Sequence, residues 1–222
     1  MAPVGRTPKL RMRPEWSPRS PTEAFDLIDR VVMGVLVTPG PEGLAVSHLP
    51  FLLDRGRGPH GTLVSHLARA NDHAALVGDH VQSVAIFRAE HGYISSSWYP
   101  ENPVRDSAPT WNFAVVHCHG YLQPLLGVAT ARHLRDLVER MEEGRENRWR
   151  TAELGSNGMK RRLHHILGFE LTIDRLDAKF KMGQDERLYD TRAAIEALRR
   201  DGNEELADLM EAHNSNRPAG EE

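Results

Sequence analysis

The chain has 222 residues, which is enough for one domain with its own hydrophobic core and short flanking segments. Its 28 Lys and Arg residues are nearly balanced by 31 Asp and Glu residues, so the formal net charge is −3. Proteins that bind nucleic acid mainly through phosphate contacts usually carry a basic excess, so nucleic acid is not favoured as a partner. We find no apolar run suited to a membrane span or a signal peptide, and the single cysteine, Cys118, is typical of a reducing compartment. We therefore expect a cytoplasmic protein without a membrane partner.

The predicted elements begin after an irregular, proline-containing arm. A helix is expected to start at Ser20, with Pro21 in its first turn. Short apolar, β-branched runs separated by Gly and Pro then predict seven strands. The expected strands are residues 31–38, 44–53, 62–67, 81–87, 93–98, 111–122 and 166–176, with a polar loop over 100–109. The later expected helices are a short turn over 71–77 capped by Asn71, one capped by Thr130, one over 159–165, and two over 191–200 and 204–213.

This order of elements favours a mainly β fold with flanking helices, of the α+β class. The strands follow one another with few helices between them, which is typical of a closed or partly closed β-barrel rather than of a doubly wound parallel sheet. We expect the barrel to form a cofactor-binding domain over residues 20–178. The arm covers residues 1–19, and a loop, helices and a polar tail cover residues 179–222.

Five short stretches combine aromatic residues with hydrogen-bonding side chains near predicted strand ends. They are residues 47–51, 65–71, 93–99, 109–113 and 116–120. This mixture is typical of a pocket for a flat conjugated cofactor. Eight of the twelve histidines lie between His48 and His119, so histidine chemistry is a candidate for this part of the chain.

Two of these stretches, and a cationic segment after the last strand, leave alternatives open. Arg69 can bind a phosphate or a propionate where a strand turns into a helix, but an exposed arginine beside a helix cap is the commoner explanation of this stretch on its own. His117 and His119 can chelate a metal from one strand face, although no third ligand is identifiable and a zinc hydrolase is not favoured. Cys118 between them is either activated by imidazoles or a small buried hydrophobe. Residues 179–187 are either a solvated charged loop or a segment that folds over a site.

Taken together and in this order, the motifs resemble the PaiB family of FMN-binding negative transcriptional regulators. That family reads SHLPF, GHLARANP, AYISPSWY, VPTWNY-AVVH and KxKLSQN. The counterparts here are residues 47–51, 65–72, 92–99, 108–117 and 179–185. The resemblance covers residues 22–200 and implies a split β-barrel, like that of FMN-binding proteins, which forms a homodimer with cofactor sites at the subunit interface.

Several residues depart from the regulator pattern, and the chain is similar in these respects to a haem-dependent branch, the piperazate synthases. Gly92 and Ser96 replace Ala and Pro, Cys118 and His119 follow the shared His117, and residues 181–185 read KMGQD. The branch converts N5-hydroxy-L-ornithine to L-piperazic acid with loss of water. The resemblance thus implies haem b as cofactor, with FMN as the alternative, and a small amino-acid substrate. The alternative functions are an FMN-binding regulator and a haem- or flavin-binding protein without catalysis.

The resemblance to the haem-dependent branch implies roles for individual residues in binding the cofactor and in catalysis. His66 is the expected iron ligand, because His is the usual proximal ligand of haem and Arg69 beside it can pair with a propionate. His48 and His117 are the alternative ligands. Lys181 is the expected base for the α-amine, from its position in the family motif, and His117 is a second catalytic candidate. The expected cofactor-binding residues are Ser47, His48, Ser65, His66, Arg69, Trp111 and Asn112.

Overall fold

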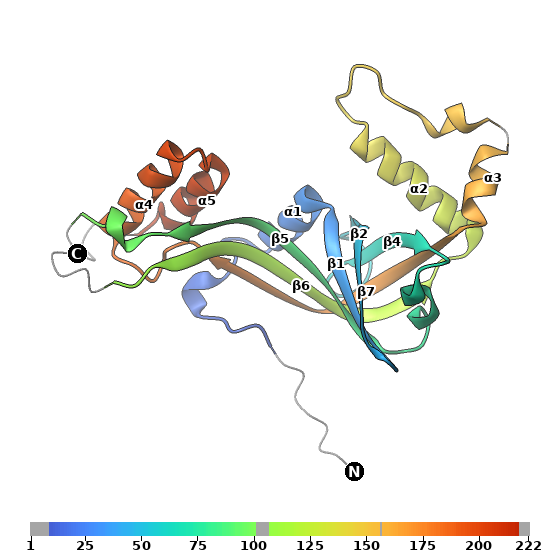
Figure 1. Ribbon diagram of the computed structural model, residues 1–222, viewed down its shortest axis with the longest axis horizontal. Coiled ribbons are helices and arrows are strands. Elements are labelled where there is room, and N and C mark those ends of the chain that lie inside the picture. Colours follow the sequence, from blue (N-terminus) through green and yellow to red (C-terminus); the bar gives the residue numbers. More distant parts are fainter. Residues whose placement is uncertain (1–8, 101–106, 156, 218–222) are drawn as a thin grey trace, which may run out of the picture. The chain divides into compact units, whose positions relative to one another are not determined.

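The computed structural model describes residues 9–100, 107–155 and 157–217, which contain one seven-stranded sheet and five α-helices (Figure 1). The strand order is β2-β1-β5-β6-β7-β4-β3, and β1 pairs antiparallel with β2 and β5, as β4 does with β3 and β7. The strands are β1 (Met33–Gly40), β2 (Gly43–Pro50), β3 (Leu52–Asp54), β4 (Thr62–Ala68), β5 (Gln82–Ile94), β6 (Thr110–Pro124) and β7 (Ile166–Lys181). The helices are α1 (Glu23–Val31), α2 (Gly127–Met141), α3 (Gly158–Leu163), α4 (Leu188–Arg200) and α5 (Glu204–Asn214).

A single residue, Phe51, joins the two edge strands of this sheet. β2 and β3 stand at opposite ends of the strand order, yet only Phe51 separates them in the chain. Because consecutive Cα atoms are about 3.8 Å apart, the sheet must curl until its edges meet. The Ser65 hydroxyl of β4 donates to the Pro50 carbonyl at 2.7 Å, and the Phe51 ring packs edge-on against Phe87 and Phe169 at 5.5 and 6.2 Å. The sheet therefore closes into the barrel that the sequence predicts.

The chain groups into two compact units. We call residues 25–87 and 117–176 the barrel unit, and residues 1–24, 88–116 and 177–222 the helical unit. Strands β5, β6 and β7 each contribute residues to both. The division into an arm over 1–19, a domain over 20–178 and a segment over 179–222 stays a prediction, since compact grouping alone does not define what folds independently.

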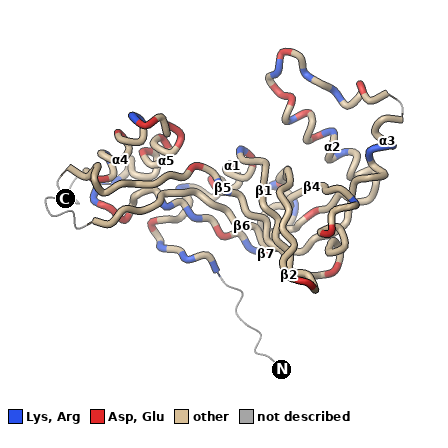
Figure 2. Tube along the Cα trace, in the orientation of Figure 1, with Lys and Arg blue, Asp and Glu red and all other residues tan. Residues whose placement is uncertain are grey.

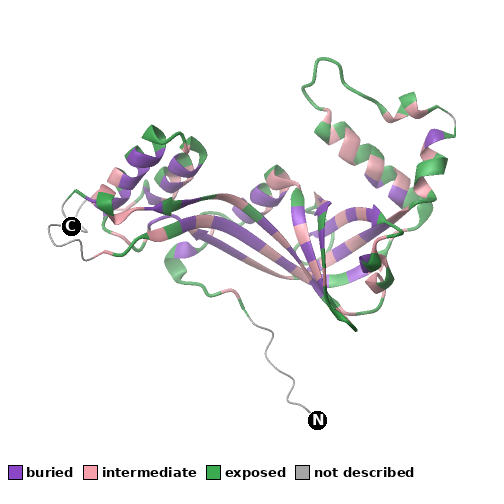
Figure 3. Ribbon diagram, viewed as in Figure 1, coloured by how far each residue is buried: buried purple, intermediate pink, exposed green. Residues whose placement is uncertain are grey.

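Each unit has its own core. In the barrel unit, buried residues alternate with more exposed ones along the strands, as β4 shows in Figure 3. Its fully buried side chains include Leu36, Leu63, Phe87, Phe169 and Leu171. In the helical unit, α4 and α5 bury an apolar stripe that includes Leu198, Leu206 and Met210.

Some local expectations about the elements are wrong for identifiable reasons. The sequence predicts two strands over 81–87 and 93–98, but one strand, β5, runs from Gln82 to Ile94, with Arg88 and His91 at exposed positions of the continuous strand. Thr130 does not cap a helix: α2 begins at Gly127, and the Thr130 hydroxyl bonds the Leu125 and Leu126 carbonyls from inside the first turn.

Other predictions about the elements are confirmed, or are confirmed with different first or last residues. Asn71 is a cap, as predicted, since its side chain accepts from the His73 N–H at 2.9 Å. The last strand, β7, continues to Lys181, so residues 179–181 belong to a strand and not to a loop. Residues 101–106 of the expected polar loop lie outside the described residues. Within the described part of the chain, no helix has both the length and the apolar composition to span a bilayer.

Candidate functional site

His66, the predicted iron ligand, is half-buried on β4 and forms a pair with His133 of α2. Its Nδ1 lies 3.1 Å from Nε2 of His133. Burial lowers the pKa of His66; burial and the neighbouring His66 lower the pKa of His133 to about 4. Both imidazoles are therefore neutral at pH 7, and one nitrogen donates while the other accepts. No hydrogen bond is made by the Nε2 of His66 to a described residue, and the Nδ1 of His133 is buried without a partner among them.

The two predicted serines use their hydroxyl groups inside the barrel unit. Ser47 is buried, and its Oγ lies 3.0 Å from Nδ1 of His73. The Nε2 of His73 lies 2.8 Å from the Thr38 hydroxyl. Ser65 is also fully buried and donates to a backbone carbonyl across the barrel closure. Ser47 thus links β2 to the short helical segment at residues 72–76, and Ser65 links β4 to the end of β2, whereas His48 on β2 is exposed.

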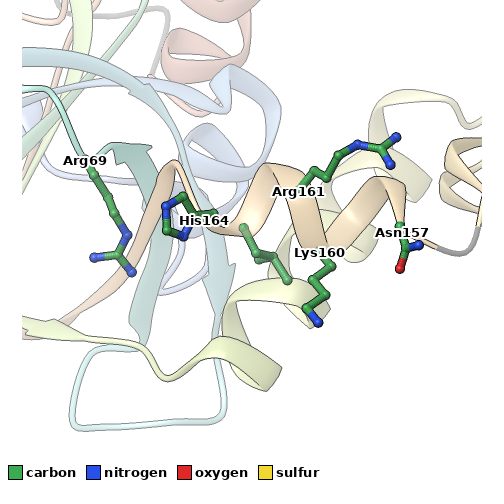
Figure 4. Close-up of a pocket in the computed structure, with 6 residues that line it drawn as sticks. Arg69, Asn157, Lys160, Arg161 and His164 are labelled. Carbon is green, nitrogen blue, oxygen red and sulfur yellow. The ribbon is translucent and has the colours of Figure 1, made fainter.

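Arg69 lies where β4 ends and lines an open pocket of about 930 Å³ together with residues of α3 (Figure 4). Its backbone N–H donates to the His165 carbonyl at 2.9 Å, which ties the end of β4 to the end of the α3 segment. The lining residues are Arg69, Asn157, Lys160, Arg161, Leu163 and His164.

The histidines of β6 do not form a metal centre. The rings of His117 and His119 are 6.3 Å apart, and the Nε2 of His119 lies 2.8 Å from a guanidinium nitrogen of Arg175. Among the described residues, no group of three or more His, Cys, Asp or Glu side chains could hold a metal ion. Cys118 is completely buried and burial raises its thiol pKa, so it is a small core residue and not an activated thiol.

Three predicted site residues belong to the helical unit. Trp111 on β6 is 54% exposed, and its ring lies 5.9 Å from the His91 ring and 6.2 Å from the Tyr93 ring, both on β5. This exposed aromatic cluster could stack against a flat conjugated ring. Lys181 is oriented by the Thr110 hydroxyl, to which its Nζ donates at 2.8 Å.

Asn112, in contrast, is buried. Its amide nitrogen lies 3.4 Å from the Met210 sulfur, and its Oδ1 has no partner among the described residues. An orphaned buried carbonyl is costly unless a water or a ligand reaches it. The nine predicted site residues thus divide between the units. Ser47, His48, Ser65, His66, Arg69 and His117 lie in the barrel unit, and Trp111, Asn112 and Lys181 lie in the helical unit.

Sequence reasoning missed two chemically unusual residues. His133 stands 67 positions from His66, and no motif connects them. Lys179 is buried, with its ammonium 4.2 Å from the Trp16 ring centre and 5.1 Å from that of Phe113. Burial and the neighbouring Lys181 charge lower its pKa. The sequence signal that could have identified Lys179 is its spacing from Lys181 in the KxK motif. Residues two positions apart on a strand lie on the same face, so Lys179 belongs to the same face as the predicted base.

The barrel closure and the arrangement of strands define the class of this protein as a split β-barrel. The fold is similar to that of a FAD and haem binding protein from Mycobacterium smegmatis, with a TM-score of 0.55 and 20% identity over 75% of this chain and 73% of that one. It is also similar to the flavocytochrome Anf3 from Azotobacter vinelandii, with a TM-score of 0.54 and 17% identity over 72% of this chain and 66% of that one.

Residues 11–175 match the family described as "Putative FMN-binding domain", and the chain belongs to this family. It is 27% identical over 192 residues to the protease synthase and sporulation protein PAI 2 of Bacillus subtilis, covering 85% of this chain and 90% of that protein. An uncharacterised protein of Saccharomyces cerevisiae is 35% identical over 80 residues, which are 35% of this chain and 47% of that protein. The predicted resemblance to the PaiB family is confirmed.

Proposed function

We propose that this protein is a haem-binding member of its family in which His66 ligates the iron. The observation that carries the proposal is the pair of His66 and His133. Histidines that bind metals usually have their second ring nitrogen held by a hydrogen bond, which fixes the tautomer and the ring orientation. His133 stays neutral to about pH 4, so its Nε2 can accept from the Nδ1–H of His66. The lone pair on Nε2 of His66 is then available to a metal.

The reaction that we propose for this branch of the family is the closure of N5-hydroxy-L-ornithine to L-piperazic acid. The α-amine attacks N5, the N–N bond forms as the N–O bond breaks, and one water leaves, so no external electron donor is consumed. Bound haem supplies Lewis acidity toward the departing hydroxyl group. The protein must accept a proton from the attacking amine. Lys181, oriented by the Thr110 hydroxyl, is the proposed base, and His117 is the second candidate.

The experiment is reconstitution of the purified protein with haem, followed by absorption spectroscopy and a mass-spectrometric assay. We expect a Soret band that His66→Ala removes and that added imidazole partly restores. His60→Ala, at an exposed position outside the predicted site residues, is the matched control and should leave the band unchanged. The product should be lighter than N5-hydroxy-L-ornithine by one water. If the Soret band of His66→Ala is unaltered, His66 is not the iron ligand. If haem-loaded protein leaves N5-hydroxy-L-ornithine unchanged, the protein is not the proposed cyclase.

An FMN-binding transcriptional regulator is the second candidate, and the match of residues 11–175 to the FMN-binding domain family, together with the resemblance to the PaiB regulators, supports it. The outcome that selects it is flavin absorption in place of a Soret band, together with site-specific binding to DNA at physiological salt. The net charge of −3 provides little general attraction to DNA, so binding of that kind would require a localised surface.

We also propose that the protein is a homodimer. In the helical unit, Trp111 is 54% and Tyr93 48% exposed, and such adjacent aromatic surface is typical of an interface. Analytical ultracentrifugation should give twice the mass of the chain. A monomer that binds its cofactor stoichiometrically would contradict this proposal.

A further inference from the structure

Lysine is scarce in this chain, and two of its lysines lie two positions apart on β7. Of the 28 Lys and Arg residues, only four are lysines, namely Lys9, Lys160, Lys179 and Lys181. Lys9 and Lys160 are exposed, whereas Lys179 is buried in the helical unit with 8% of its surface exposed. Arginine stays charged in proteins, but a buried lysine can lose its proton. Lys179 is therefore a candidate for chemistry that needs a neutral amine.

Two aromatic rings, and no hydrogen-bond acceptor, surround the amine of Lys179. Its Nζ lies 4.2 Å from the centre of the Trp16 ring and 5.1 Å from that of the Phe113 ring. Among the described residues, the Nζ has neither a hydrogen-bond partner nor a carboxylate within ion-pair distance. Unlike the Nε1 of Trp16, which is completely buried without a partner, this Nζ keeps some accessible surface. The ring faces attract an ammonium but take no proton from it, so the nitrogen is not held by an acceptor.

Other cations lie near the amine. Lys181 is on the same face of β7, and the N-terminal arm, whose basic residues Figure 2 shows, contributes Arg11 and Arg13. Burial is the main cause that lowers the pKa of Lys179, and the charge of Lys181 is the next. Arg11 and Arg13 act in the same direction, while Asp185 acts against them. The neutral amine is therefore more populated at Lys179 than at an exposed lysine.

We propose that Lys179 is a nucleophilic amine that forms an imine with a small carbonyl compound carrying a carboxylate. The free amine attacks the carbonyl carbon, a C=N bond replaces the C=O bond, and the carbonyl oxygen leaves as water, so no oxidant or reductant is consumed. Desolvation and an adjacent cation are the two ways in which proteins activate lysine nucleophiles. The neighbouring charges of Lys181 and Arg11 favour an anionic carbonyl compound over a neutral one. This chemistry needs neither haem nor flavin, and it differs from the role proposed for Lys181, which accepts a proton and forms no covalent bond.

Reductive trapping of the full-length protein with glyoxylate tests the proposal, because glyoxylate is a small aldehyde with a carboxylate. Sodium cyanoborohydride reduces each imine to a stable secondary amine, and peptide mass spectrometry then locates the label among the four lysines. At pH 7 we expect Lys179 to be labelled before the exposed Lys9 and Lys160, and its labelling to persist to lower pH than theirs. Labelling in the order of exposure, with Lys9 and Lys160 first, would overturn the proposal.

Two variants and a second aldehyde separate activation by charge from simple access. Lys181→Gln should slow the labelling of Lys179 and leave that of Lys160 unchanged, whereas an unchanged rate at Lys179 would overturn its activation by the neighbouring charge. Arg192→Gln is the matched control, since Arg192 is exposed on α4 and is not among the cations that act on Lys179. Acetaldehyde, which has no carboxylate, should label Lys179 more slowly relative to Lys160 than glyoxylate does, and equal ratios would overturn the preference for an anionic compound. Thermal unfolding of each variant checks that its fold is intact.

Discussion

Replacement of Glu23 by Gln should lower the free energy of unfolding by an amount that the structure sets. Glu23 begins α1 and is 8% exposed. Its Oε1 accepts from Nε of Arg19 at 2.7 Å and lies 3.1 Å from Nε2 of His213 on α5. Burial alone raises the carboxyl pKa, but the hydrogen bonds from His213 and Arg19 more than offset it and lower the pKa from 4.5 to about 2.

The magnitude follows from linkage. A shift from 4.5 to about 2, at about 1.4 kcal/mol per pKa unit, corresponds to about 3 kcal/mol of stability at pH 7. The unfolded carboxyl takes up a proton near pH 4.5, whereas the folded one stays charged to about pH 2. The contribution of Glu23 is therefore fully present above pH 4.5 and is lost as the pH falls through 2.

Urea unfolding followed by circular dichroism tests this reasoning. At pH 7, Glu23→Gln should lose about 3 kcal/mol, and it should lose less additional stability in acid than the original protein. Glu15→Gln is the matched control: Glu15 is 39% exposed and lies 3.7 Å from Arg13, so its loss should cost under about 0.5 kcal/mol. Equal losses in the two variants, or identical acid dependence of Glu23→Gln and the original protein, would refute the argument.

Two further predictions concern packing. Gly92→Ala should destabilise the protein by about 1–3 kcal/mol in thermal or urea unfolding, because a Cβ there would lie 2.8 Å from Leu206; unchanged stability would mean that α5 shifts freely. Cys118 should react with an aromatic disulfide reagent only as fast as the protein unfolds, because it is fully buried and its thiol pKa is raised; rapid stoichiometric labelling in native buffer would contradict its burial.

The packing of Gly92 changes the meaning of one departure from the regulator pattern. Gly92 stands where the regulator pattern has Ala, and it is one of the departures on which the resemblance to the haem-dependent branch rests. The structure places it under α5, so close to Leu206 and Asn203 that an Ala side chain would not fit without movement. This substitution is explained by the approach of α5 to β5 within the helical unit, and it does not distinguish haem from FMN.

Local sequence patterns determined most of the elements. The alternation along residues 62–67 correctly predicted β4, and the Asn71 cap followed from the hydrogen-bonding preference of its side chain. The class of fold also followed, because closely spaced strands without intervening helices leave few topologies other than a barrel. These properties depend on residues that are close together in the sequence, so they can be predicted from the sequence alone.

Tertiary structure alone decided which side chains act together. The pairing of His66 with His133 depends on α2 packing beside β4, and the α3 pocket depends on β4 pairing with β7. Ser47 and Ser65 carry the residue types of a binding site, yet their hydroxyl groups bond inside the barrel. Spacing along the chain does not encode these outcomes, because partners far apart in sequence meet only when the sheet curls and its helices dock. Burial then lowers the pKa values of His66 and His133 and leaves the Nδ1 of His133 without a hydrogen-bond partner among the described residues.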